Sequence, residues 1–308
     1  MRIAIMGSGG LGGYFGARLA LGGADVHFVA RGAHLQAMRS TGLRVEGPEP
    51  MHVPEVHATD DPAQIGVVDF VLLGVKLWDT EQAIAQMRPL VGPDTTVISF
   101  QNGVLKDQSL RAAFSERQLM GGVGYVASTI SEPGVIRQTG PMQRLIFGEF
   151  DGTRSARGEA LLAACLAGGI QAELSQDIVR EIWQKYVFLV GLSGTTTTMR
   201  RTIGPIRSNP QTRAFLLDVM REVVAVGRAH GVALPEDFAE ASGLKRADDV
   251  SPDMTSSMHH DLERGNRLEV RWLSGGVVEL GRAKGVPTPL NRAIADILAL
   301  HAEGARHA

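Results

Sequence analysis

Residues 3–12 have the sequence IAIMGSGGLG, in which an apolar run of strand type is followed by a GxGxxG motif. Glycines at these spacings permit a tight turn, a close approach of the backbone to a pyrophosphate and close packing of a helix on a strand. An alanine-rich helical segment, 14–21, and a second apolar run, 26–30, follow, and this context makes the motif informative. We therefore predict a dinucleotide-binding loop made of Gly7, Ser8, Gly9, Gly10, Leu11 and Gly12.

The second apolar run ends at Arg31. In a site for NAD, the end of this strand usually carries Asp or Glu, whose carboxylate binds the ribose 2′-hydroxyl. A guanidinium suits a 2′-phosphate instead, because it offers several charged donors to phosphate oxygens. The expected cofactor is therefore NADP (as NADPH when reduced), and the alternative is that Arg31 is a solvated loop residue.

Strand-type and helical segments alternate through the first hundred residues. After a region rich in Gly and Pro, 42–62, which we expect to be mostly loop, the continuous apolar run 67–75 is typical of a buried parallel strand. A helical segment, 77–87, leads to another such run, 95–100. This alternation predicts a right-handed, doubly wound parallel sheet of the Rossmann type. In such a sheet ligands bind outside the carboxyl ends of the strands. The residues at those ends are Gly7, Arg31, Lys76 and Asn102.

The pattern changes after residue 119. Short β-type runs at 124–130, 134–139 and 144–148 predict antiparallel strands that extend the sheet. A helical segment and one last strand, 170–174, follow, and the remainder has helical spacing. We therefore expect an α/β chain with an N-terminal Rossmann-type NADP-binding domain, 1–176, and an all-helical substrate and catalytic domain, 177–308.

The helical half contains a lysine at a notable position. In the predicted helix 178–192, Lys185 shares a stripe with Leu189 and Ser193, four and eight residues later. The alternative is a lysine that extends its ammonium group into water. The run TTTT at 195–198 follows, and the sequence gives it no purpose.

Three helix starts are predicted further on. Ser257 is a possible cap of a short helix, 258–264. Asn266 and Glu269 have the spacing of a capping box at the start of a long helix, 268–284. Thr288 is expected to cap the last helix.

The amino-acid composition excludes several classes of partner and site. The 308 residues are 44% hydrophobic and 21% charged with a formal net charge of -2, so no basic excess attracts nucleic acid or an anionic membrane. The one cysteine, Cys165, excludes an internal disulfide, and the most apolar stretch of the second half, 186–192, is too short to span a bilayer. Adjacent histidines, His259 and His260, point apart on a helix and predict no metal site. We expect a cytoplasmic protein whose partner is a small molecule.

These segments, taken together and in order, resemble the ketopantoate reductase (2-dehydropantoate 2-reductase) family along nearly the whole chain. The matching pieces are GSGGLG at 7–12, VK at 75–76, QNG at 101–103, IWQK at 182–185, SM at 257–258 with Asp261, Glu269, and GVPTP at 285–289. The resemblance implies NADPH-dependent reduction of a 2-keto acid, by default ketopantoate to pantoate in pantothenate biosynthesis. It also implies that Lys185 is the catalytic lysine and that Glu269 is its partner carboxylate. Asn102 and Ser257 match substrate contacts, and Arg31 and Lys76 match cofactor contacts. We expect Asn102 to lie near the nicotinamide end of the cofactor as well.

The chain also departs from this family. Leu189 and Ser193, which we expect to contact the substrate, replace asparagines that the family commonly has, and Ser274 stands where the family often has another. Fewer amide donors favour an alternative substrate, a bulkier, more apolar 2-keto acid reduced by a D-2-hydroxyacid dehydrogenase. Further alternatives are a 3-hydroxyacid dehydrogenase, whose sequence patterns are missing, and a non-catalytic NADP-sensing protein. A homodimer is a possible state, with 270–280 as either interface or core.

Overall fold

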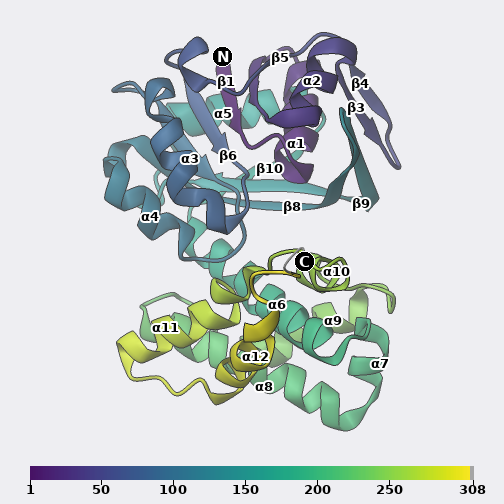
Figure 1. The fold of residues 1–308 in the computed structure, drawn as a ribbon. Helices are drawn as coiled ribbons and strands as arrows, with labels where there is room; N and C mark the ends of the chain where they lie inside the picture. Colours follow the sequence, from purple (N-terminus) through teal and green to yellow (C-terminus); the bar gives the residue numbers. More distant parts are fainter. Residues whose placement is uncertain (306–308) are drawn as a thin grey trace. The chain divides into compact units, whose positions relative to one another are not determined.

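The computed structural model describes residues 1–305 and divides into two compact units. The first comprises Met1–Asn102 and Lys106–Glu181, and the second comprises residues 182–305. The short segment Gly103–Leu105 belongs to the second unit, so the chain enters that unit twice. All strands of the described residues lie in the first unit, and the predicted α/β class, with a helical C-terminal region, is confirmed (Figure 1).

One ten-stranded sheet forms the frame of the first unit, in the order β4-β3-β9-β8-β7-β6-β1-β2-β5, with β10 beside β9. The strands β5, β2, β1, β6, β7 and β8 are parallel neighbours, and β1 lies between β2 and β6, where the strand order reverses. The strands are β1 Arg2–Met6, β2 Asp25–Val29, β3 Leu43–Glu46, β4 Met51–Val53, β5 His57–Thr59, β6 Phe70–Leu73, β7 Thr96–Ser99, β8 Leu119–Glu132, β9 Val135–Gly148 and β10 Gln171–Leu174.

Helices cover both faces of this sheet, as a doubly wound fold requires. The alternation of β1 divides its side chains: Ile3 and Ile5 join one core cluster, whereas Ala4 and Met6 join the other. The first cluster includes residues of α1, α2 and α5, and the second includes residues of α3 and α4. The helices are α1 Gly10–Leu21, α2 Gly32–Thr41, α3 Thr80–Gln86, α4 Lys106–Ala113 and α5 Ala156–Ala167.

Two expectations for this unit need correction. The region 42–62, expected to be mostly loop, contains the three short strands β3, β4 and β5. The three predicted antiparallel strands are two long ones, β8 and β9, which do pair antiparallel. Gly140 and Pro141 do not end β9, because the pairing passes from Gln138–Ser128 to Gln143–Val126 and a bulge takes up the residues between.

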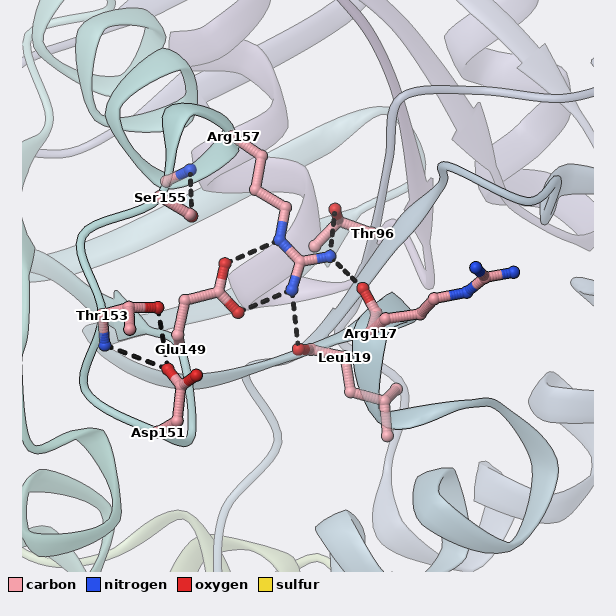
Figure 2. A network of polar contacts seen from close by, with 9 residues as sticks. Thr96, Arg117, Leu119, Glu149, Asp151, Thr153, Ser155 and Arg157 are labelled. Carbon is pink, nitrogen blue, oxygen red and sulfur yellow. Dashed lines mark hydrogen bonds and ion pairs between the residues drawn. The ribbon is translucent and has the colours of Figure 1, made fainter.

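A partly buried ion pair joins α5 to the sheet (Figure 2). Arg157 donates to both carboxylate oxygens of Glu149, at 2.7 and 2.5 Å. The same guanidinium donates to the carbonyls of Arg117 and Leu119 and to the hydroxyl of Thr96. Every one of these partners is an acceptor, so the cost of burying the charge is offset by directed hydrogen bonds.

In the described residues of the second unit, all regular secondary structure is helical. Its long helix α8 has a buried face at Leu216, Val219, Val223 and Val226. Thr288 occupies the N-cap position of α12, as expected, but Glu222 of α8 accepts the N–H groups of Leu290 and Asn291. The helices are α6 Ile178–Met199, α7 Ile203–Ser208, α8 Pro210–Ala229, α9 Lys245–Asp249, α10 Ser257–Glu263, α11 Ser274–Lys284 and α12 Pro289–Leu298, with a π-helical turn at Ala239–Leu244 and 3-10 turns at Glu269–Arg271 and Ala299–His301.

Within the described residues, 1–305, none of the helices combines the length and apolar character that crossing a membrane requires. The segment 270–280, offered above as interface or core, contributes Val270, Leu273, Val277 and Leu280 to the buried interior. These four side chains are therefore core residues.

Candidate functional site

The glycine loop has the geometry of a dinucleotide loop. Gly7 has a φ of +98°, which side chains rarely permit. A Cβ on Gly12 would lie 2.1 Å from the carbonyl oxygen of Gly7, and one on Gly10 would lie 2.1 Å from that of Ser128. A Cβ on Gly9, in contrast, would meet no atom within 4 Å. Packing of the protein explains three of the glycines, whereas at Gly9 the bare backbone faces open space, as a cradle for a pyrophosphate requires.

Ser8 fixes the loop between β2 and α2. Its backbone N–H and its hydroxyl both donate to the carbonyl oxygen of Val29, at 3.2 and 3.0 Å. Its own carbonyl accepts a 2.9 Å hydrogen bond from Nε2 of His34, and Nδ1 of His34 accepts from the N–H of Gly134. Burial lowers the pKa of His34, which favours the neutral ring that these two contacts need. His34 was not predicted from the sequence, because one of its two partners, Gly134, lies 100 residues further along the chain.

Arg31 lies exposed at the N-cap of α2, just beyond the end of β2. Its Nη2 donates to the amide oxygen of Gln86 at 2.7 Å. Among the described residues no carboxylate forms an ion pair with Arg31. A neutral partner leaves the charge of the guanidinium available to an anion, as the expected 2′-phosphate contact requires.

The neighbouring strand ends carry Lys76 and Asn102, both half-buried. The ammonium group of Lys76 lies 5.5 Å from the ring centre of Trp78. Gln101 joins the two strand ends, because its amide donates to the carbonyl of Val75 at 3.0 Å and to the hydroxyl of Thr80 at 2.8 Å. Gln101 was absent from the predicted site, although it lies inside the QNG segment. We infer that it holds the segment bearing Asn102 against the end of β6.

In the second unit, α6 presents Lys185 and Leu189, both half-buried, one turn apart. Ser193, a further turn along, is fully buried at 0% exposed, and its Oγ has no hydrogen-bond partner within residues 1–305. Along this stripe of α6 the side chains are therefore a cation at Lys185, an apolar group at Leu189 and a buried hydroxyl at Ser193.

Glu269 is 5% exposed and begins a 3-10 turn, Glu269–Arg271. The predicted capping box is wrong: Leu268 holds the N-cap position and Asn266 donates to Asp261 instead. The long helix predicted from 268 is also interrupted, and α11 begins only at Ser274.

Tyr186 joins the Glu269 turn to α6 at this interruption. Its buried hydroxyl contacts the carbonyl oxygens of Leu273 at 2.7 Å and Trp272 at 3.0 Å. The N–H groups of Trp272 and Leu273 donate in turn to the carbonyl of Glu269. Because Tyr186 follows Lys185 directly, the turn that carries the predicted carboxylate packs against the helix segment that carries the predicted lysine.

Ser257 is the first residue of α10 and is exposed. The expectation that it caps this helix is wrong, because Ser256 holds the N-cap and accepts from the N–H of His259 at 3.1 Å. No hydrogen bond of the Ser257 hydroxyl is found among residues 1–305. Since the cap is made by its neighbour, this hydroxyl is available to a ligand.

Three of the four threonines at 195–198 have a local hydrogen-bond partner, whereas the buried Oγ1 of Thr197 has none among residues 1–305. The hydroxyls of Thr195, Thr196 and Thr198 donate to the carbonyls four residues earlier, at 2.6–2.8 Å. These bonds let polar side chains occupy a buried helix. Over the described part of the chain, 1–305, no three His, Cys, Asp or Glu residues are grouped to hold a metal ion.

Comparisons with known proteins identify the family. The model of ketopantoate reductase PanE/ApbA matches residues 3–152, and that of its C-terminal part matches residues 177–302. A 2-dehydropantoate 2-reductase of Mesorhizobium japonicum is 34% identical over 311 aligned residues, covering 94% of each chain.

Solved structures agree. A 2-dehydropantoate 2-reductase of Geobacter metallireducens superposes with a TM-score of 0.91 at 29% identity, covering 97% of this chain and 99% of the other. A D-mandelate dehydrogenase solved with NADH has the same fold, with a TM-score of 0.89 over 98% of both chains, at 18% identity. The chain belongs to the ketopantoate reductase family and is an oxidoreductase that acts on a CH–OH group.

Proposed function

We propose that this protein reduces a 2-keto acid to the corresponding 2-hydroxy acid with NADPH, and that the acid is ketopantoate (2-dehydropantoate). The setting would be pantothenate biosynthesis in the cytoplasm. The observation that carries the proposal is Lys185, half-buried on α6 beside the tyrosine that packs the Glu269 turn. Relatives named 2-dehydropantoate 2-reductase, 34% and 32% identical over nearly the whole chain, support the substrate.

The cofactor assignment uses residues of the first unit. Gly9 leaves space for the pyrophosphate, and Arg31 offers an unneutralised guanidinium for a 2′-phosphate. Lys76 and Asn102 extend this set along the strand ends. When bound, NADPH supplies the hydride that reaches the carbonyl carbon. We assign cofactor binding to residues 1–176 and the chemistry to 177–308.

Negative charge develops on the carbonyl oxygen during hydride transfer, and a proton must reach that oxygen. The ammonium group of Lys185 is the proposed donor, and it must lie within about 3 Å of the oxygen. The carboxylate of Glu269 favours the charged ammonium and orients it. The hydroxyl of Ser257 and the amide of Asn102 are proposed to bind the substrate.

The test is Lys185→Ala, with ketopantoate turnover followed by loss of NADPH absorbance. General acid catalysis contributes on the order of 10²- to 10⁴-fold, so kcat should fall by that factor while the Kd for NADPH stays within about twofold. Near-normal turnover would remove Lys185 from the mechanism. Tight NADPH binding by the wild-type protein, without oxidation by any 2-keto acid, would favour the NADP-sensing alternative.

A second candidate is a D-2-hydroxyacid dehydrogenase acting on bulkier, more apolar 2-keto acids. Leu189 favours it, because an apolar side chain one turn from Lys185 replaces an amide that could bind a substrate hydroxyl. The kcat/KM values for ketopantoate and for a branched aliphatic and an aromatic 2-keto acid distinguish the two. A preference for ketopantoate of tenfold or more would reject the second candidate.

A further inference from the structure

His259 is a buried histidine, 5% exposed, that the proposed chemistry does not use. Its Nδ1 lies 2.7 Å from the carbonyl oxygen of Thr196 in α6. A carbonyl only accepts, so Nδ1 carries a proton and donates to it. The other ring nitrogen, Nε2, lies 3.1 Å from Oε1 of Glu263, one turn further along α10. A carboxylate oxygen also only accepts, so Nε2 donates to Glu263 as Nδ1 donates to Thr196, and each ring nitrogen has a defined acceptor.

The same turn of α10 has a second connection to Thr196. Ser256 caps the helix by accepting from the N–H of His259, and its Oγ lies 3.3 Å from Oγ1 of Thr196. The Thr196 hydroxyl is itself oriented by its 2.6 Å bond to the carbonyl of Leu192. Residues on both sides of Ser257 are thus attached to one point of α6.

That point lies on the catalytic face of α6. Thr196 comes 11 residues after Lys185, which is about three helical turns. The helix α10 has only seven residues, too few to be stable without tertiary contacts. The place of its first turn therefore depends on these attachments.

We propose that His259 is a positioning residue: by binding Thr196 and Glu263 with its two ring nitrogens, it sets where Ser257 stands relative to the Lys185 stripe of α6. The inference rests on the proposed function, which assigns substrate binding to Ser257. This role explains why α10 has a buried imidazole at His259. It also means that the carbonyl of Thr196, as the acceptor of that imidazole, affects substrate affinity. His259 touches no reacting atom in this account, so it affects KM rather than the proton transfer.

A matched pair of amides tests this role. In His259→Asn the side-chain N–H₂ can take the place of Nδ1 and still donate to Thr196, whereas the longer amide of His259→Gln takes the place of Nε2 and leaves that carbonyl without its donor. Loss of one buried hydrogen bond predicts a KM for the 2-keto acid about tenfold higher in H259Q. In H259N the KM should stay within about threefold of the wild type. In both variants kcat and the KM for NADPH should change less than about threefold.

His260→Gln is the positional control. His260 is exposed, contacts Thr255 and Glu263, and has no contact with Thr196 among those found in the described chain. Its KM should equal that of the wild type. Equal KM values for H259Q and H259N, an effect of H260Q as large as that of H259Q, or a fall in kcat with KM unchanged would each overturn the positioning role.

Hydrogen exchange separates a failure of this inference from a failure of the proposed function. The amides of 255–263 should exchange faster in H259Q than in the wild type, H259N or H260Q, and this measurement needs no turnover. If the wild type reduces no 2-keto acid but the exchange follows this order, the attachment stands and the proposed function fails. If the wild type is active and H259Q retains its KM and its exchange rates, the inference is wrong.

Discussion

Two adjacent glycines of the nucleotide loop should respond in opposite ways to the same added methyl group. In Gly9→Ala the new Cβ meets no protein atom within 4 Å, and the backbone φ of -74° suits alanine. In Gly10→Ala the new Cβ would lie 2.1 Å from the carbonyl oxygen and 2.7 Å from the carbonyl carbon of Ser128. Both atoms belong to the backbone of β8, so this neighbour cannot move aside as a side chain could.

The magnitudes follow from these distances. For G9A, alanine at an N-cap lowers the free energy of unfolding by about 0.5–1 kcal/mol, and the smaller conformational entropy of the unfolded chain raises it by about 0.4–1 kcal/mol. The two effects nearly cancel, so the Tm should stay within about 2 °C of the wild type. A methyl group where the pyrophosphate approaches should cost about 1–3 kcal/mol of binding, or roughly 5- to 150-fold in Kd. For G10A the added methyl group overpacks the folded protein itself, so the free energy of unfolding should fall by about 1–3 kcal/mol and the Tm by about 2–12 °C.

The assays are a fluorescence titration with NADPH and thermal unfolding without it, on both variants. The expected result is a stable G9A protein that binds NADPH poorly and a G10A protein that unfolds at a lower temperature. If G9A binds NADPH as the wild type does, the open side of Gly9 is not where the pyrophosphate lies. If G10A is as stable as the wild type, the contact with Ser128 does not constrain the loop.

Three further predictions concern single side chains. Arg31→Ser should raise the Kd for NADPH by about tenfold or more and leave the Kd for NADH unchanged, because a charged hydrogen bond to phosphate contributes about 1.5–3 kcal/mol. Gln86→Ala, which removes the neutral partner of Arg31, is the control, and an equal loss of affinity for NADPH and NADH in R31S would contradict a 2′-phosphate contact. Tyr186→Phe removes the one hydroxyl that contacts the carbonyls of Leu273 and Trp272, so calorimetry should show about 1–3 kcal/mol lower free energy of unfolding, and an unchanged Tm would argue against those bonds. Burial raises the pKa of Cys165 to about 12, so a thiol reagent at neutral pH should modify only the unfolded protein, and rapid labelling of the native one would show that the thiol is accessible.

The sheet was predictable because its signals are local. The glycine loop and the apolar runs each report their own strand, and β6 and β7 fall inside the predicted runs 67–75 and 95–100. The long pair β8 and β9 was divided too finely because Gly140 and Pro141 are usual signs of a turn. In the structure a bulge accommodates them, and a bulge depends on the partner strand rather than on local sequence.

The helical half was harder to predict because tertiary contacts override its local signals. Asn266 and Glu269 have capping-box spacing, but α11 begins only at Ser274, and the hydroxyl of Tyr186 contacts the carbonyls of Trp272 and Leu273 just before that start. That contact joins residues more than eighty positions apart, so no window of sequence contains it. The same holds for His259, whose i+4 spacing to Glu263 was visible but whose partner Thr196 was not.

The resemblance to ketopantoate reductases implies that Ser193 and Ser274 stand where the family commonly has asparagines, and this bears on which acid is reduced. The Oγ atoms of Ser193 and Ser274, like Oγ1 of Thr197, are buried and have no hydrogen-bond partner within the described residues, whereas Thr195, Thr196 and Thr198 satisfy theirs with carbonyls of the same helix. A buried hydroxyl left in this state costs about 1–3 kcal/mol, and such local exceptions are expected at functional rather than purely structural positions. Serine is shorter than asparagine and its hydroxyl offers one donor in place of two, so these positions of α6 and α11 supply fewer hydrogen-bond donors than an amide would. The predicted cofactor residues lie in the first unit and these serines lie in the second, so an effect of the serines on specificity should appear in the acid and not in the nucleotide.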